Sequence, residues 1–472
     1  MATYYVDSEN GSDTFGTGAI DAPFKTISYG ILNATDFSDG YAYVAVKHTS
    51  NPNLGYDSTI RNIEVDIDSG LTTGTFIGTD LTLQDIGKIM YDGVYARRIT
   101  NVIPATNFFE VESTFDVSGI DIGVAIYNQP YPFWVINSHT SVSAGYRLLV
   151  VGYKETFNEE TGVSDMDVDQ PYGQDPYDAY VNGVDTDRCI ELTADPTLVS
   201  DFVRIQTVYI QLRNFYIHGT AVGADLLNMN HANAQYTDFY NCKFGKTGNY
   251  IVYDWYTGAA GARRGIIFTK CYLDHQNPAL SGVHAAGASC VIFDGCVFNG
   301  QDHPSDGWNF TIIVAGLSQV AVCDSYFYNG DAGIYPGTGA HAYVKNCTFW
   351  GQKKVCVAAS GAIIHATNNV ICPRPGGAHL GSGVPSGSVV SDYNIFWSTD
   401  NIPPTNFWLS LAAVIPSPIG LHSIVANPQI RYKQGIGYIA MGPEARQLRA
   451  GTNIDAVLYN RGTLANGDNR LL

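Results

Sequence analysis

A short alternation of apolar and polar residues recurs eight times between residues 209 and 398. Aligned on their shared core, the repeats place one column at Phe215, Cys242, Cys271, Cys296, Ser325, Cys347, Asn369 and Asn394. Two places later every residue is apolar, at Ile217, Phe244, Leu273, Phe298, Phe327, Phe349, Ile371 and Phe396. Alternation with a period of two predicts strands, and a column that stays apolar in every repeat predicts an inward face.

Further, mostly apolar columns lie three and five places before the shared column, and this odd offset predicts a corner between two strands. The corner position is occupied by Asn214, Asn241, Lys270, Gly295, Asp324, Asn346 and Asn368. Asn, Asp and Gly tolerate positive φ at least cost, so a sharp bend in each repeat would select them. Repeats of this length without a helical face predict a parallel β-helix; an antiparallel sandwich would not keep the same corner chemistry in phase.

Both ends of the chain carry short motifs. The opening has a YYV strand at 4–6, a GSD loop at 11–13 and an APFKTI segment at 22–27, and the closing motif lies at Gly451 to Asp455, after Asn427. Both ends therefore resemble right-handed β-helix proteins of the pectate-lyase-like superfamily, in which an Asp is usual at the position of Asn427. The resemblance implies an all-β fold, a single-stranded right-handed parallel β-helix. A short amphipathic segment from Phe24 to Leu32 is expected to form a capping helix at the open end.

Between the first strands and the repeats the pattern becomes compact. A turn at Asp85 to Lys88 and a strand at Arg97 to Val102 resemble small β-modules of bacteriophage virion proteins. The predicted organisation is a cap and first coil at 1–50, an inserted small β-module at 51–130, the parallel β-helix at 131–425, and the last coil and tail at 426–472. Residues 154–188 are expected to be a long loop, of the kind that is often functional.

Composition narrows the partners. The formal net charge is −18, which argues against nucleic acid and anionic membranes, because both need a basic face. No secretory leader follows Met1 and no long apolar run occurs, so we expect cytosolic synthesis and no membrane insertion. The nine Cys lack metal-ligand spacing, and those in the inward column are expected to be free thiols; no metal and no cofactor is predicted.

Candidate chemistry lies just past the repeat strands. A polysaccharide lyase needs a base and a group that neutralises the uronate, and a glycosidase needs two carboxylates. The candidate catalytic residues are Asp274, His275, Asp302, His303 and Asp306, with His284 in the same loops and Asp254 on the preceding coil. The candidate carbohydrate-binding residues are Trp255, Tyr256, Arg263, Arg264 and Trp308. The alternative is that these are turn residues chosen for backbone reasons and aromatic residues of ordinary packing.

The resemblances favour a structural component of a bacteriophage virion, either a capsid decoration or a tail-attached β-helix protein. They imply a homotrimer whose partners are virion capsid or tail proteins, with cell-surface polysaccharide as a candidate ligand. The alternative function is a polysaccharide-degrading enzyme, a tailspike-like depolymerase, lyase or glycosidase, acting on the lateral face of the β-helix. A third interpretation is a glycan-binding adhesin without catalytic activity.

Overall fold

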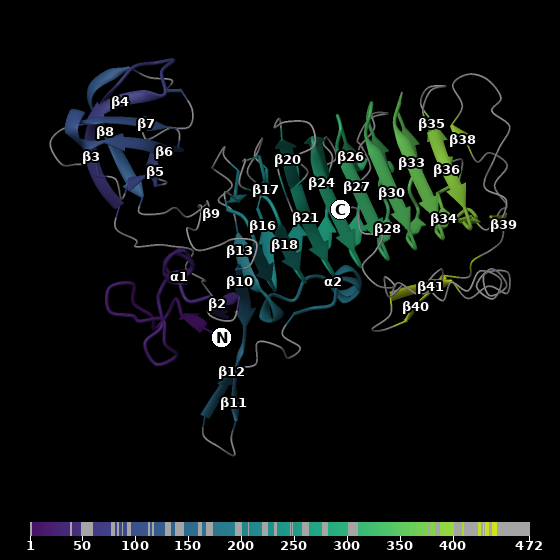
Figure 1. The fold of residues 1–472 in the computed structure, drawn as a ribbon, viewed down its shortest axis with the longest axis horizontal. Helices are drawn as coiled ribbons and strands as arrows, with labels where there is room; N and C mark the ends of the chain where they lie inside the picture. The colour runs from purple at the N-terminus through teal and green to yellow at the C-terminus, as the bar shows by residue number, and fades with distance from the viewer. Residues whose placement is uncertain are drawn as a thin grey trace.

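The computed structural model shows a parallel β-solenoid built from three long sheets, together with a small closed barrel (Figure 1). The structure describes residues 2–37, 40–48, 60–76, 81–82, 85–86, 88–91, 96–111, 114–115, 118–127, 134–136, 146–158, 163–166, 173–193, 201–205, 207–219, 225–230, 234–245, 247, 249–256, 264–275, 282–300, 310–359, 361–375, 378–382, 388–400, 408–409, 423–425, 428, 430–433 and 437–440. Within these residues no helix is long and apolar enough to cross a membrane.

Sheet 1 opens each coil and, among the described residues, has eleven strands. In spatial order they are β1 (Ala2–Val6), β2 (Tyr41–Lys47), β10 (Arg147–Tyr153), β15 (Ile210–Arg213), β18 (Thr237–Tyr240), β21 (Arg264–Thr269), β24 (Ser289–Asp294), β27 (Gln319–Cys323), β30 (His341–Lys345), β33 (Ile363–Thr367) and β36 (Ser388–Asp392). Neighbouring strands pair in parallel, from β1 with β2 through β33 with β36.

Sheet 2 follows the corner. Its described strands are β13 (Ile190–Thr193), β16 (Phe215–His218), β19 (Lys243–Gly245), β22 (Tyr272–Asp274), β25 (Val297–Asn299), β28 (Tyr326–Tyr328), β31 (Thr348–Trp350), β34 (Val370–Cys372), β37 (Ile395–Phe396) and β39 (Ile424–Val425). Sheet 3 closes each coil with β9 (Trp134–Ile136), β14 (Val203–Ile205), β17 (Leu227–Asn228), β20 (Val252–Tyr256), β23 (Val283–Gly287), β26 (Phe310–Val314), β29 (Ala332–Pro336), β32 (Lys354–Ala358), β35 (Ala378–Ser382) and β38 (Trp408–Leu409).

The predicted parallel β-helix is confirmed, and so is the register of its inward columns. Phe239 pairs with Phe268 and Phe268 with Phe293, as the alignment of the repeats requires. Their rings stack from coil to coil with centroids 4.7 and 4.9 Å apart. A fully buried aromatic ring removes a large apolar area from water, so stacked columns of this kind are the main source of stability in a fold that has only neighbour contacts.

The corners bend as predicted. Asn214, Asn241, Lys270, Gly295, Asp324, Asn346 and Asn368 all have positive φ, between 49° and 63°. Among these residues, only Lys270 is of a type for which positive φ is sterically unfavourable. The preference for Asn, Asp and Gly at the corners is therefore explained by the positive φ that each corner requires.

The column after the corner is buried and carries both thiols and amides. All nine cysteines are free, as expected. Where the column is polar, side chains bond along the solenoid: the Cys347 N–H donates to Asn369 Oδ1 (2.9 Å), and the Asn369 N–H donates to Asn394 Oδ1 (2.8 Å). These amides satisfy backbone groups that a turn leaves unpaired inside the core.

A short helix, α1 (Ile27–Asn33), lies between β1 and β2, close to the predicted amphipathic segment. Thr26 caps it, accepting a hydrogen bond from the Tyr29 N–H (3.2 Å). Ile27 and Ile31 are buried in the same core as Val44 of β2. The proposed capping role of this helix stays a prediction.

Strands β3 (Ile60–Ile67), β4 (Thr73–Phe76), β5 (Ile89–Tyr91), β6 (Ala96–Ile103), β7 (Phe108–Val111) and β8 (Gly119–Tyr127) form a closed antiparallel barrel, with a 3₁₀ turn, η2, at Pro104–Thr106. The barrel has a hydrophobic core of its own. At the turn singled out in the sequence, Asp85 is buried and bridges to Lys88 Nζ (2.7 Å) while accepting from the Thr82 N–H (2.6 Å). This turn holds the barrel together locally; its kinship with phage modules stays a prediction.

The expectation of a long loop at 154–188 is wrong in part. The region contains the hairpin β11 (Glu155–Asn158) and β12 (Val163–Met166), helix α2 (Pro176–Asn182) and the 3₁₀ turn η3 (Thr186–Arg188). The hairpin projects away from the solenoid in Figure 1. Near the C-terminal end β40 (Ile430–Lys433) pairs with β41 (Gly437–Ala440), whereas Asn427 and Gly451 to Asp455 lie outside the described residues.

Candidate functional site

The strongest candidate site lies on the outer face of sheet 3, where β14, β17, β20 and β23 run side by side. Parallel pairing aligns Arg204 with Asn228, Asn228 with Tyr253, and Tyr253 with His284. Residues at one register position in neighbouring parallel strands lie about 4.8 Å apart, so these four side chains form one row across the coils. Three residues before the members of this row, just ahead of β14, β17 and β20, lie Asp201, Asp225 and Tyr250.

Two carboxylates are held at one end of the row by a hydrogen-bond network. Asp201 accepts from Arg204 Nη2 (3.0 Å), from Asn228 Nδ2 (2.7 Å) and from the backbone N–H of Asp225 (3.2 Å). The Asp225 side chain in turn accepts at Oδ1 from Asn249 Nδ2 (2.6 Å) and from the Tyr250 N–H (3.3 Å). These bonds join residues of three successive coils. Asp225 is only 6% exposed, so its carboxyl is largely removed from water.

Burial and the neighbouring Asp201 raise the pKa of Asp225 to about 7, although the bonds from Tyr250 and Asn249 and the nearby Arg204 lower it. A carboxyl in this state is partly protonated at neutral pH and can donate as well as accept a hydrogen bond. The effect spreads to the rings beside it: burial and then Asp225 raise the pKa of both Tyr250 and Tyr253. Perturbed groups of this kind concentrate at functional sites.

Four rings continue the row away from the carboxylates. The centroid of His284 lies 5.0 Å from Tyr250, 5.6 Å from Tyr253 and 5.8 Å from Trp255, and Tyr250 stacks on Tyr253 at 5.6 Å. Trp255 remains 43% exposed. Burial lowers the pKa of His284, which keeps its imidazole neutral at pH 7, and its Nδ1 is buried without a hydrogen-bond partner among the described residues. We call Tyr250, Tyr253, Trp255 and His284 the aromatic row.

The arrangement suits a ligand that offers both an apolar face and polar groups. An exposed indole beside phenol rings can stack against a sugar ring, and the neighbouring carboxyls can exchange hydrogen bonds with hydroxyl or amino groups. The described residues hold no cluster of three or more His, Cys, Asp or Glu side chains placed for a metal ion.

The predicted site residues divide between faces. Asp274 ends β22 of sheet 2 and accepts a hydrogen bond from Asn299 Nδ2 (2.9 Å), and His275 is 2% exposed. Trp255 and His284 instead lie on sheet 3, and Asp254 is fully buried there. The structure therefore brings Trp255 and His284 together on sheet 3, while Asp274 ends a strand of sheet 2 and His275 directly follows that strand. Asp302, His303, Asp306, Arg263 and Trp308 lie outside the described residues, and for Tyr256 and Arg264 only the strand position is described.

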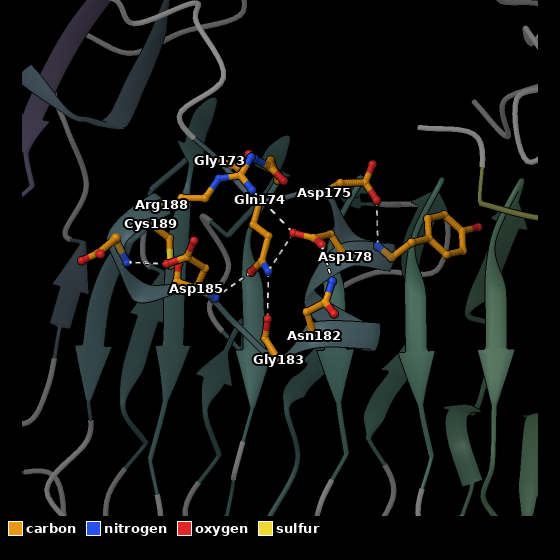
Figure 2. Close-up of polar contacts among 12 residues, drawn as sticks. Gly173, Gln174, Asp175, Asp178, Asn182, Gly183, Asp185, Arg188 and Cys189 are labelled. Atoms are coloured by element: carbon orange, nitrogen blue, oxygen red, sulfur yellow. Dashed lines mark hydrogen bonds and ion pairs between the residues drawn. The ribbon is translucent and has the colours of Figure 1, made fainter. Parts of the chain in front are cut away.

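The outer face of sheet 2 is covered by a segment of the chain itself. Helix α2 packs on β22 and β25, placing Tyr177 and Ala179 in one cluster with Tyr272, Val297 and Tyr326. Figure 2 shows the polar contacts that shape this segment: Gln174 Nε2 donates to Asp178 Oδ2 (3.1 Å) and to the Gly183 carbonyl (2.8 Å), while its Oε1 accepts from the Asp185 N–H (2.8 Å). We call residues 173–189 the strap.

Sequence reasoning missed Asp201, Asp225, Tyr250 and Tyr253. Asp201 and Asp225 precede short strands outside the recurring core pattern, where the repeats differ in length and no column aligns them. The signal that was present is the run NYIVYDWY at 249–256, in which three aromatic residues fall on alternate or capping positions of one strand. Alternation would have placed Tyr253 and Trp255 on the same outer face, with Asp254 inward.

No protein family matches the chain, and no curated protein sequence matches it. Similar solved structures include the rice weevil pectin methyl esterase, with 10% identity over 70% of this chain and 78% of that chain and a TM-score of 0.27. The tailspike gp49 of Pseudomonas phage LKA1 has 13% identity over 82% and 71% of the two chains, with a TM-score of 0.21. The Gp54 tailspike of Acinetobacter baumannii bacteriophage AP22, solved with a capsular saccharide, has 8% identity over 81% and 73%, with a TM-score of 0.23. Likenesses of this size carry no argument about function.

Proposed function

We propose that this chain is a bacteriophage virion component that binds cell-surface polysaccharide on the outer face of sheet 3. The observation that carries the glycan part is the aromatic row with its exposed Trp255, set beside the Asp201 and Asp225 carboxyls. Stacking of a sugar ring on an aromatic face, with polar groups that fix its orientation, is the usual chemistry of carbohydrate recognition. The virion part rests on the resemblances of the chain ends and of the region from Asp85 to Val102.

Retention of the protein on immobilised capsular polysaccharide or O-antigen tests the glycan part. Trp255→Ala is expected to weaken retention about tenfold, since loss of a stacking ring removes roughly 1–2 kcal/mol. The matched control is Tyr236→Ala, directly before β18 of sheet 1, because Tyr236 is also 43% exposed and stacks on Tyr209. Equal loss in both variants, or no retention by the unmodified protein on any preparation, would contradict the proposal.

The virion part has a separate test. Mass spectrometry of purified particles is expected to detect the chain together with capsid or tail proteins, and its absence from the particles would refute this placement. Light scattering after size exclusion measures the oligomeric state, for which we propose a homotrimer.

A second function, cleavage of the bound polysaccharide, is favoured by one observation. Asp225 holds a proton near neutral pH beside a second carboxylate, and a protonated carboxyl is the general acid that glycoside hydrolysis needs. New reducing or unsaturated ends on incubation with polysaccharide would indicate this activity, and Asp225→Asn is expected to abolish it. The earlier prediction of catalysis at Asp302 and Asp306 is tested alongside by Asp302→Ala with Asp306→Ala.

A further inference from the structure

The network on sheet 3 contains more carboxylates than cations. Asp201 and Asp225 are joined through the Asp225 N–H, and Arg204 is the one described cation that bonds to either. Its guanidinium bonds to Asp201, which also takes Asn228 Nδ2. The donors on Asp225 are a neutral amide and a backbone N–H. Among the described groups, therefore, no full positive charge bonds to the buried Asp225.

The second carboxyl oxygen of Asp225 is left without a described donor. Both described donors reach Oδ1, and no described residue donates to Oδ2. The remaining titratable groups nearby are Tyr250 and Tyr253 on β20 and its approach, and His284 on β23, which burial keeps neutral. None of these supplies a cation at neutral pH. The faces of the rings do attract cations, because the quadrupole of an aromatic ring is negative on its face.

We propose that the polysaccharide bound on this face presents a free amino sugar, whose ammonium group pairs with Asp225 beside the rings of Tyr250 and Tyr253, while the sugars that follow stack along the aromatic row toward Trp255. This inference rests on the proposed glycan-binding function and adds the chemical class of the ligand. A uronic-acid or sialic-acid polymer would bring a further negative charge to two carboxylates and is the wrong class. A neutral or N-acetylated sugar would stack equally well but would leave Asp225 without a cationic partner.

Pairing of an ammonium group with Asp225 should also release a proton, which stacking alone would not do. Burial and Asp201 raise the pKa of Asp225 to about 7, so below that pH the carboxyl keeps a proton in the free protein. An ammonium group that pairs with Asp225 favours the ionised form, so the proton leaves to the buffer when the ligand binds. Binding at about pH 6 should therefore release a proton, approaching one per ligand.

Calorimetric titration with a β-1,4-linked glucosamine tetramer and with its fully N-acetylated counterpart tests the amino-sugar inference. Buffers of different ionisation enthalpy report the protons released on binding. About 0.15 M salt screens the long-range attraction of the cationic tetramer to the acidic protein. The amino tetramer is expected to bind about tenfold tighter and to release a proton, and the N-acetylated tetramer to release none. Asp225→Asn should remove both the preference and the proton release while keeping an acceptor for Asn249 and Tyr250.

Asp331→Asn is the matched control, since Asp331 is similarly buried at 5% exposure, bonds to Arg374, and changes the net charge equally. It should keep both the preference and the proton release. Proton release by the unmodified protein is decisive even if Asp225→Asn folds poorly. Equal affinity for the two tetramers, with Trp255 still required for retention, would overturn the amino-sugar inference and leave glycan binding intact. Loss of all glycan retention would instead refute the proposed function itself.

Discussion

Lys243 on sheet 2 and Asp225 on sheet 3 are both buried ionisable side chains, and their hydrogen-bond partners differ. On sheet 2, Lys243 has no exposed surface; its ammonium donates to the Gln174 carbonyl, to Asn241 Oδ1 (2.6 Å) and to the Asn241 carbonyl (3.2 Å). On sheet 3, Asp225 receives two described donors, both at one oxygen. The strap covers the first group, whereas the second lies beside Tyr250, in an aromatic row that ends at the exposed Trp255.

The two buried groups differ in whether the protein itself satisfies their hydrogen-bonding capacity. Three acceptors match the three hydrogens of an ammonium group, so Lys243 is satisfied within the chain and ties the strap to sheet 2. The carboxyl of Asp225 keeps an oxygen free of described donors, in a row that is open at Trp255. A buried charge that the protein satisfies by itself stabilises an arrangement; one left incomplete at an accessible edge points to a ligand.

The largest expected effect comes from Lys243→Met, which keeps the volume but removes all three donor hydrogens. The buried Gln174 carbonyl and the two Asn241 acceptors lose their partner, and we expect the free energy of unfolding to fall by about 4 kcal/mol. Urea denaturation measures the change, and hydrogen exchange of residues 173–189 shows whether the strap loosens. Lys25→Met, at an exposed position of the same residue type, should change stability by less than about 0.5 kcal/mol. A small effect at Lys243 would show that the strap is held by Tyr177 packing alone.

The next effect is the pH dependence that Asp225 confers. Its folded pKa of about 7 lies above the unfolded value of 3.8, so between these pH values the folded state holds a proton that the unfolded state has lost. Stability therefore falls as pH rises through this window, and the Asp225→Asn variant should escape that fall, by roughly 3 kcal/mol between pH 4 and pH 7. Urea midpoints of the two proteins at several pH values measure the difference.

Asp7 should give the opposite pH dependence of stability within the same chain. Burial alone would raise its pKa, but hydrogen bonds from Asn10, Lys47 and Glu9 lower it overall. The stability that Asp7 contributes is present at pH values above its unfolded pKa, and it is lost as the pH falls through the lowered folded pKa. Asp7→Asn should therefore destabilise the protein at neutral pH and not at low pH. Parallel pH profiles for the two variants would contradict the assignment of the raised pKa to Asp225.

The same contrast explains how far the sequence could predict this molecule. The columns and corners repeat in phase, so Phe239 and Phe268, or Asn241 and Asn346, could be placed without a structure. Sheet 3 follows loops of unequal length, and the partners there are separated by about one coil: 24 residues between Asp201 and Asp225, and 24 again to Asn249. These polar residues lie in loops outside the aligned apolar columns, so the repeat pattern does not mark them as partners. Trp255 was predicted because exposed aromatics are conspicuous, whereas Asp225 was not, because its role depends on burial.

The smallest stability effect should come from Trp255→Ala, although its effect on glycan retention is expected to be large. The indole is 43% exposed, and its described ring contacts are with Tyr253 and His284, so its removal should lower the free energy of unfolding by only about 1 kcal/mol. Tyr326→Ala on the covered face is the comparison: Tyr326 is 1% exposed and contacts Tyr177 and Tyr180 of the strap, and its loss should cost about 3–5 kcal/mol. Thermal and urea denaturation of the two variants measure the ratio. If Trp255→Ala proved as destabilising as Tyr326→Ala, the aromatic row would be part of the packed structure, and loss of retention in that variant would no longer identify a binding face.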